Sequence, residues 1–250
     1  MEEQQDQQQN LTKRERKELR RQEKTEAKDQ VQRSKTMKRW ITWLSVIVGI
    51  AIVVGGFVWA VVNSNPAENT PLADTVVDTD WTKGNQDASV VLVEYSDLQC
   101  PACASYEPMI KQVIENFSED VLFVYRHFPL KSIHPNAEEA GWAAEAAGQQ
   151  DAFWEMHDIL FNRQTAWSAL SNPKDTFIDY AKELGLNAEQ FDTDYESDTA
   201  RDKVNSDYQS GVRSSVQGTP TFFINGETIS NPRTYDEFAN IITNALGSAE

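Results

Sequence analysis

The sequence predicts an α/β domain with a parallel strand–helix–strand unit and a helical insertion, preceded by a single N-terminal transmembrane helix. Three observations predict this class. Residues 40–62 form an uncharged apolar run, residues 89–127 carry strand, helix and strand patterns in turn, and the pattern over about 134–215 is helical before a strand pattern returns. At 250 residues the chain has room for one sizeable domain and smaller extras.

The first 39 residues are polar and densely charged, with 12 Lys and Arg against 8 Asp and Glu. They contain almost no apolar residue that could enter a core, so we expect residues 1–39 to be a disordered tail or a solvated helix. A short coiled coil is the alternative. It is disfavoured because Leu11, Leu19 and Val31 do not form a heptad seam.

Residues 40–62 (WITWLSVIVGIAIVVGGFVWAVV) are expected to form the membrane anchor. At about 1.5 Å per residue, a helix of this length crosses a hydrocarbon core of about 30 Å. A cleaved signal peptide is the alternative, but its apolar region is usually only about 7–15 residues long. Basic residues directly precede the run and none lies in 63–82, which predicts a single-pass protein of the cell membrane with a cytoplasmic N-terminus and an extracytoplasmic domain.

Residues 63–80, which include Pro66 and Pro71, are expected to form a linker, and residues 81–250 the folded domain. From residue 63 onward the chain carries 11 Lys and Arg against 31 Asp and Glu. An acidic surface of this kind repels phosphate backbones, so nucleic acid is excluded as an expected partner.

The domain begins with a strand–helix–strand unit. Residues 89–95 (SVVLVEY) are a short β-branched run that predicts a buried strand, and 121–127 (VLFVYRH) predicts a second one. Between them, 101–117 has apolar residues at helical spacing. The order predicts parallel strands joined by a right-handed crossover.

Local signals set further boundaries. Asn172 before Pro173 predicts a helix start with Pro in the first turn, Gly185 predicts the end of that helix, and Asn187 predicts the start of another. Asn225-Gly226 within 221–230 predicts a β-hairpin with a type I′ turn. A last helix is expected over 235–246.

The chain has two cysteines, Cys100 and Cys103, which follow the first predicted strand directly. Disulfide exchange needs one accessible thiolate and a second thiol close by. At a helix start, free backbone N–H groups and the helix dipole stabilise a thiolate on the first cysteine, and the second lies one turn further in. Pro101 and Ala102 separate them, and Pro suits the first helical turn. The motif therefore predicts a redox-active disulfide.

Two other interpretations of the cysteines are weaker. A zinc site would need further ligands, and only three histidines, His127, His134 and His157, are available. A structural disulfide across two residues closes too short a loop to stabilise the fold much. We therefore expect no metal and no cofactor other than the Cys100–Cys103 disulfide.

Two further features accompany the cysteines. Glu94 lies inside the apolar strand, where a buried carboxylate has a raised pKa and can accept a proton from Cys103 through water. A water-facing Glu at the strand end is the alternative. Thr219-Pro220 precedes a predicted strand, and its proline is either an ordinary turn residue or part of a substrate-binding segment.

Taken together, these residues resemble the DsbA-like thiol–disulfide oxidoreductases of the thioredoxin superfamily. The resemblance covers roughly Trp81 to Leu246 and rests on five motifs in the family's order. They are VVLVEYSDLQCPAC (90–103), YRHFPL (125–130), HPNAEEAGWAAEAAG (134–148), DAFWEMHDILF (151–161) and GTPTFFING (218–226).

The resemblance implies a thioredoxin-like fold in which Cys100 is the attacking thiol, Cys103 the resolving thiol, Glu94 the buried acid and Pro220 a cis proline. Thr219 would then pair with an extended substrate segment. It also implies cysteine-containing exported proteins as substrates and a membrane redox partner that reoxidises the pair. The dipeptide Pro101-Ala102 differs from the Pro-His of strongly oxidising members, which leaves the direction of electron flow open.

The leading hypothesis is an extracytoplasmic oxidase that forms disulfides in exported proteins. A membrane-anchored reductase or isomerase of the same fold is the nearest alternative, and the reduction potential separates the two. A non-catalytic tethered binding module and a cytoplasmic reductase of inverted topology are the others.

Overall fold

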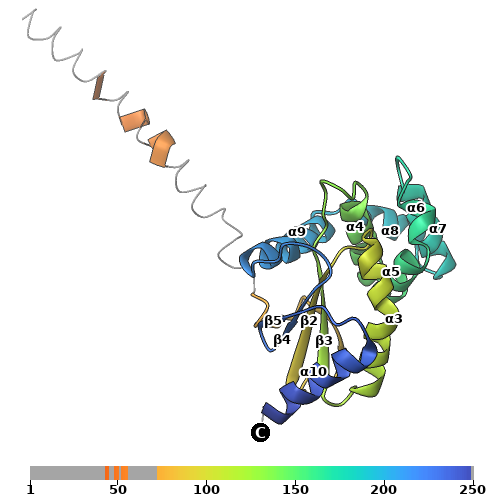
Figure 1. Ribbon diagram of the computed structural model, residues 1–250. Helices are drawn as coiled ribbons and strands as arrows, with labels where there is room; N and C mark the ends of the chain where they lie inside the picture. Colours follow the sequence, from red (N-terminus) through yellow and green to blue (C-terminus); the bar gives the residue numbers. More distant parts are fainter. Residues whose placement is uncertain (1–42, 45–47, 51, 56–71, 249–250) are drawn as a thin grey trace, which may run out of the picture. The chain divides into compact units, whose positions relative to one another are not determined.

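In a computed structural model the chain forms a five-stranded sheet flanked by helices, and residues 43–44, 48–50, 52–55 and 72–248 are described (Figure 1). Among these residues there is no helix whose length and hydropathy would let it cross a membrane. Most of the anchor predicted for 40–62, and all of the tail predicted for 1–39, lie outside the described residues.

The sheet is mixed, with the strand order β1-β3-β2-β4-β5. The central strands β2 (Val90–Ser96) and β3 (Val121–His127) are parallel and joined by α3 (Pro101–Asn116), which confirms the predicted strand–helix–strand unit. On one side, β4 (Thr221–Ile224) pairs antiparallel with β2, and β5 (Glu227–Ile229) pairs with β4. On the other, β1 (Trp81–Gly84), a strand that the sequence did not predict, pairs antiparallel with β3.

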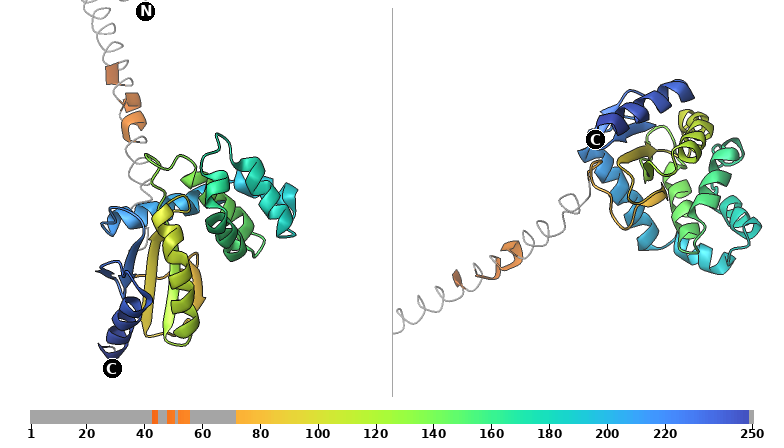
Figure 2. Two further views of the ribbon diagram at one scale, coloured as in Figure 1. Left: turned by 45° about the vertical axis from the view of Figure 1, so that its right-hand side comes forward. Right: turned by 90° about the horizontal axis from the view of Figure 1, so that it is seen from below.

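Helices cover both faces of this sheet (Figure 2). One face packs against α3 and the C-terminal α10 (Tyr235–Ser248), where Phe222 of β4 meets Phe238 of α10. The other face packs against α9 (Asp198–Arg213) and the segment that precedes β1. Because side chains alternate along a strand, Leu92 and Glu94 of β2 face α3. Val93 and Tyr95 face the opposite side.

Residues 137–213 form the predicted helical insertion. Its helices before α9 are α4 (Ala137–Gly148), α5 (Phe153–Asn162), α6 (Gln164–Trp167), α7 (Lys174–Glu183) and α8 (Ala188–Tyr195). The alanine-rich α4 lies at their centre, in contact with α5, α7, α8 and α9, because its small side chains allow close approach. The insertion packs beside the sheet, and α5 also contacts α3, where Lys111 pairs with Asp158.

Most of the helix ends and the hairpin turn that the sequence predicted are confirmed. Asn187 caps α8, with its Oδ1 accepting hydrogen bonds from the backbone N–H groups of Glu189 and Gln190. Gly185 follows α7 with φ +77°. The helix α7 begins one residue later than predicted, so that Pro173 is its cap rather than its first residue. In the β4–β5 hairpin, Asn225 and Gly226 have φ values of +48° and +83°, as a type I′ turn requires.

The linker predicted for residues 63–80 is wrong for residues 72–80, which belong to the folded domain. The cause is Arg126 of β3, whose side chain is fully buried. Its guanidinium donates to both carboxylate oxygens of Asp80, at 3.0 and 2.7 Å, and to the backbone carbonyls of Leu72 and Thr75. A buried cation must be compensated, and residues 72–80 supply the charge and the acceptors.

Candidate functional site

Cys100 lies at the N-terminus of α3, where it is the N-cap residue ahead of Pro101. The loop that joins it to β2 is held on both sides. Asp97 accepts a hydrogen bond from the backbone N–H of Gln99 at 2.7 Å, and the Gln164 side chain donates to the carbonyls of Leu98 and Cys100 at 2.8 and 3.0 Å. These contacts fix the position of the first cysteine at the positive end of the helix dipole.

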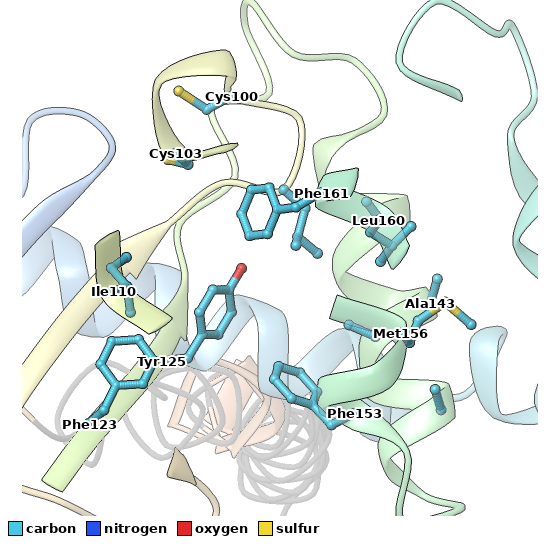
Figure 3. Close-up of a cluster of buried hydrophobic side chains, with 14 of the residues drawn as sticks. Cys100, Cys103, Ile110, Phe123, Tyr125, Ala143, Phe153, Met156, Leu160 and Phe161 are labelled. Carbon is cyan, nitrogen blue, oxygen red and sulfur yellow. The ribbon is translucent and has the colours of Figure 1, made fainter. Parts of the chain in front are cut away.

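The two cysteines differ in their surroundings. Cys103 is only 1% exposed, whereas Pro101 and Ala102 are exposed and Cys100 lies between these extremes at 6%. Figure 3 shows both cysteines at the edge of the cluster of buried side chains. Neither cysteine is in a disulfide. The Sγ of Cys100 lies 3.6 Å from the backbone carbonyl oxygen of Thr219, and the Thr219-Pro220 peptide bond is cis. The segment that the sequence singled out therefore faces the first cysteine.

The pKa values of the two thiols are shifted in opposite directions. Hydrogen bonds, above all from the Cys103 thiol and also from the backbone N–H groups of Cys103 and Ala102, lower the pKa of Cys100 to about 5, against the opposing effect of burial. Burial raises the pKa of Cys103 well above its ordinary value. At neutral pH the pair therefore carries one thiolate, on the cysteine that substrates can reach.

We expect the alkylation rate of the reduced protein by iodoacetamide to rise with pH around a midpoint of about 5, because the thiolate is the reactive form. A Cys103→Ala variant loses the thiol hydrogen bond and should show a midpoint at higher pH. The folded-state pKa of Cys100 is below its ordinary value of 9.0, so its contribution to stability is lost as pH falls from 9 through 5. A midpoint near 9 in the wild type would contradict the site geometry.

Glu94 is 3% exposed and faces α3 from the middle of the sheet. Burial and, to a smaller extent, the charge of Glu107 raise its pKa to about 8, against the opposing effect of the Ser96 hydroxyl. The charge of Glu94 in turn raises the pKa of Cys103, so the two groups are electrostatically coupled. The structure thus places Glu94 in the core and not at a water-facing strand end.

The three histidines are each paired with a carboxylate. His127 Nε2 lies 2.9 Å from Glu145, and His134 Nδ1 lies 2.7 Å from Asp97. His157 Nδ1 lies 3.1 Å from Asp158. In the part of the chain that the structure describes, the three histidines thus each contact a carboxylate.

Sequence reasoning missed three residues near the cysteines: Ser96, Glu107 and Tyr125. Glu107 had a signal, since it follows Cys103 by four residues and lies on the same face of α3. Tyr125 is the register partner of Glu94 in the neighbouring strand, which depends on the pairing of β2 with β3. Ser96 acts on the pKa of both Glu94 and Cys103.

A mixed sheet with a Cys-x-x-Cys at a helix N-terminus and a facing cis proline defines a thioredoxin-like fold of the DsbA type. Residues 76–244 match the family model described as thioredoxin, and the chain belongs to this family. Among solved structures, oxidised BdbD from Bacillus subtilis has a TM-score of 0.60 and 25% identity over 66% of this chain and 92% of that one. The α-DsbA1 of Wolbachia pipientis, at 20% identity and TM-score 0.62 over 70% and 94% of the two chains, shares the fold.

The chain also matches a curated relative that is named as an ion transporter and not as an oxidoreductase. The Na(+)/H(+) antiporter NhaA 3 of Salinispora tropica is 36% identical over 172 residues, which are 69% of this chain but only 26% of the relative. The chain therefore spans about a quarter of that relative's length. Its antiporter activity is not carried over to this chain.

Proposed function

We propose that this protein is an extracytoplasmic thiol–disulfide oxidoreductase that forms disulfides in exported proteins through Cys100 and Cys103. The observation that carries the proposal is the asymmetry of the pair. Cys100 has a pKa of about 5 at the surface end of α3 and faces the Thr219 carbonyl, while Cys103 is buried with a raised pKa. The membership in the thioredoxin family and the likeness to BdbD support oxidoreductase activity in general.

The exchange would run as follows in the oxidising direction. A substrate thiolate attacks the Sγ of Cys100 in the disulfide, a new sulfur–sulfur bond forms, and the Cys100–Cys103 bond breaks. The electron pair leaves on Cys103, which takes a proton from the buried carboxyl of Glu94. The second substrate thiolate then attacks the substrate sulfur of the mixed disulfide, and Cys100 leaves as a stable thiolate.

The Thr219-Pro220 segment would hold the substrate during this exchange. An extended substrate chain can pair with the backbone of Thr219, whose carbonyl oxygen already lies 3.6 Å from Cys100 Sγ. Backbone pairing of this kind is independent of substrate sequence, which suits an enzyme that acts on many exported proteins.

The thiolate supports electron flow in the oxidising direction. A hydrogen-bonded Cys100 thiolate stabilises the reduced form of the pair relative to the disulfide. The disulfide is therefore a stronger oxidant than one whose reduced form has two ordinary thiols. This supports an oxidase over a reductase or isomerase. A membrane redox partner would accept the electrons, and the anchor over 40–62 would keep the domain at the outer face of the cell membrane.

The test is the reduction potential of Cys100–Cys103 in the purified full-length protein, equilibrated in glutathione redox buffers. We expect a value close to that of strong oxidants, about −120 mV, rather than the thioredoxin value of about −270 mV. A value near −270 mV would indicate a reductase. The absence of any exchange would favour a tethered binding module. The extracytoplasmic topology is tested separately, by labelling Cys100 in intact cells with a membrane-impermeant thiol reagent.

A Glu94→Gln variant should be more stable than the wild type at neutral pH and slower in exchange. The folded-state pKa of Glu94 is raised from 4.5 to about 8, so its ionisation destabilises the fold progressively as pH rises through that interval. The gain, on the order of 3 kcal/mol at pH 7, should vanish below pH 4.5. Guanidinium unfolding between pH 4 and 8 measures it, and a stability difference that does not depend on pH would contradict the burial of a titrating carboxyl.

A further inference from the structure

The folded domain carries few cations, and nearly all of them have a partner. From residue 63 onward the chain has 11 Lys and Arg against 31 Asp and Glu. Eight of the 11 form ion pairs with carboxylates. Lys83 lies over the ring of Trp154, and Arg213 also makes an interaction. Arg233 is the remaining cation. It is exposed, and its guanidinium is in no ion pair within the described part of the chain.

Arg233 belongs to the loop between β5 and α10, which lies against the substrate-binding segment. Within this loop, Asn231 Nδ2 donates a hydrogen bond to the backbone carbonyl of Pro220 at 2.8 Å. Pro220 directly follows Thr219, whose own carbonyl oxygen lies 3.6 Å from Cys100 Sγ. The loop is therefore a direct neighbour of the segment with which an extended substrate would pair.

The start of α10 fixes the backbone of this loop without using the guanidinium. The Glu237 carboxylate accepts a hydrogen bond from the backbone N–H of Arg233 at 2.7 Å, and the Glu237 N–H donates to the Thr234 hydroxyl at 3.2 Å. A reciprocal pair of this kind stabilises the first turn of a helix. Pro232 is buried and anchors the loop further. The carboxylate of Glu237 is thus engaged by the backbone, and the Arg233 side chain stays available to a ligand.

Tyr106 faces the same place from α3. It lies one turn beyond Cys103, is half-buried, and packs on Phe222 of β4 with the ring centroids 5.4 Å apart. Burial raises the pKa of Tyr106, while the charge of Arg233 acts in the opposite direction. The Tyr106 hydroxyl therefore stays protonated at neutral pH and can donate a hydrogen bond. Figure 1 shows α3 and α10 on the same side of the sheet, and the two helices are in contact.

An unpaired guanidinium beside a tyrosine hydroxyl is chemically suited to a carboxylate. The planar fork of Arg binds a carboxylate through two parallel hydrogen bonds, and such charge-assisted bonds are stronger than neutral ones. The excess of acidic side chains in this domain would otherwise repel an acidic substrate. Arg233 gives the substrate-binding end of the domain a local positive charge, and the complement of that charge is an acidic substrate segment.

The position of Arg233 determines which part of a substrate it can reach. A substrate chain paired with Thr219 is extended and rises by about 3.3 Å per residue. Arg233 lies two residues beyond Asn231, which contacts the residue after Thr219. With its long side chain, Arg233 reaches substrate positions about two to four residues from the reactive cysteine.

We propose that Arg233, assisted by the Tyr106 hydroxyl, binds a substrate carboxylate that lies close in sequence to the reactive cysteine. The protein then favours cysteines that have Asp or Glu as near neighbours. Arg233 is a specificity-determining residue and takes no part in the sulfur chemistry of Cys100 and Cys103. The inference rests on the proposed function and names the substrate class of the same site.

The test compares two dithiol peptides as substrates of the oxidised full-length protein. The peptides are identical except that their reactive cysteine is flanked on both sides by Glu in one and by Gln in the other. Formation of the peptide disulfide in a single turnover is followed by acid quench, alkylation and mass spectrometry. The ratio of the two second-order rate constants is compared between protein variants, which removes the difference in intrinsic thiol reactivity between the peptides. In Arg233→Gln we expect this Glu/Gln ratio to fall by about three- to fivefold, as for loss of a well-formed exposed ion pair.

Three further variants separate a specific contact from general effects. Arg233→Lys keeps the charge but not the planar fork, so it should keep part of the preference. Tyr106→Phe keeps the ring on Phe222 and should lower the ratio about twofold, as for loss of one hydrogen bond. Arg201→Gln makes the same change of charge at an exposed, paired position of α9 and should match the wild type. Neutral iodoacetamide should alkylate Cys100 of each reduced variant at the wild-type rate, since none of them removes a contact of the thiolate.

A purely structural role for Arg233 predicts a different result. Arg233→Gln would then slow both peptides by the same factor and leave the Glu/Gln ratio unchanged. That outcome overturns the inference, and so does an equal fall of the ratio in Arg201→Gln, which would indicate an effect of the net charge. Both outcomes leave the proposed function standing, because peptide disulfides still form. Failure of the wild type to oxidise either peptide overturns the proposed function and the inference with it.

Discussion

Replacing Cys100 by Ser should lower the rate of disulfide exchange by about three orders of magnitude or more, because a hydroxyl with no nearby base cannot replace a thiolate as nucleophile. In the wild type a thiol with a pKa of about 5 is almost fully ionised at pH 7. The measurement is the reduction of a disulfide-bonded peptide by the reduced protein, followed by mass spectrometry, for the wild type and the variant.

Replacing Cys103 by Ser should have a different effect. Cys100 still attacks a disulfide substrate, but no second thiol resolves the mixed disulfide, which should therefore accumulate as a covalent complex. Ser105→Ala, on the exposed side of the same helix, is the matched control and should behave as the wild type. Equal loss in both cysteine variants without any trapped complex would contradict the assignment of Cys100 as the attacking thiol.

The parts of the site that the sequence predicted are those fixed by short-range chemistry. Cys100 and Cys103 lie at the start of α3, as their sequence neighbours predicted. The apolar strand β2 precedes them, and Pro101 favours the first turn of a helix. Glu94 stood out because a carboxylate inside an apolar run is unusual, and the structure buries it. The cis state of Thr219-Pro220 came only from the family resemblance, since most X–Pro bonds are trans.

The parts that the sequence did not predict depend on contacts between distant segments. The strand β1 has only four residues and ends in Gly84, and it exists because β3, some forty positions later, offers an open edge. Residues 72–80 have the composition of a linker, yet Arg126 binds their carbonyl groups. The cluster of Glu107, Tyr125 and His157 joins three elements, and no spacing in the sequence shows that they meet.

Arg126→Met should be the most destabilising single change in the domain outside the apolar core. Arg126 is 0% exposed, and the Asp80 carboxylate that it pairs with is 1% exposed. The substitution leaves that carboxylate buried, with Lys203 Nζ at 3.9 Å as the nearest remaining cation among the described residues. Breaking a buried ion pair by removing one partner costs about 3–5 kcal/mol.

The loss should extend beyond the ion pair, because the same guanidinium donates to Tyr95 at 3.0 Å and Ser210 at 3.2 Å as well as to the carbonyls of residues 72–80. For a domain of this size, 1 kcal/mol corresponds to about 2–4 °C in melting temperature, so we expect Tm to fall by about 10 °C. Calorimetry of the full-length protein measures the shift. Limited proteolysis should show new cleavage between residues 72 and 80, since these residues lose their hydrogen-bond donor.

Arg163→Met is the control that separates the effect of burial on Tm from the effect of losing an ion pair. Arg163 makes an equally well-formed bidentate pair with Glu183, at 2.7 and 2.5 Å, but the two side chains are 42% and 51% exposed. Solvent screens exposed pairs, so this variant should keep nearly the wild-type Tm. If Arg126→Met and Arg163→Met lowered Tm by the same small amount, Arg126 would not be what holds residues 72–80 to the sheet, and the domain would begin at β1 as its composition suggests.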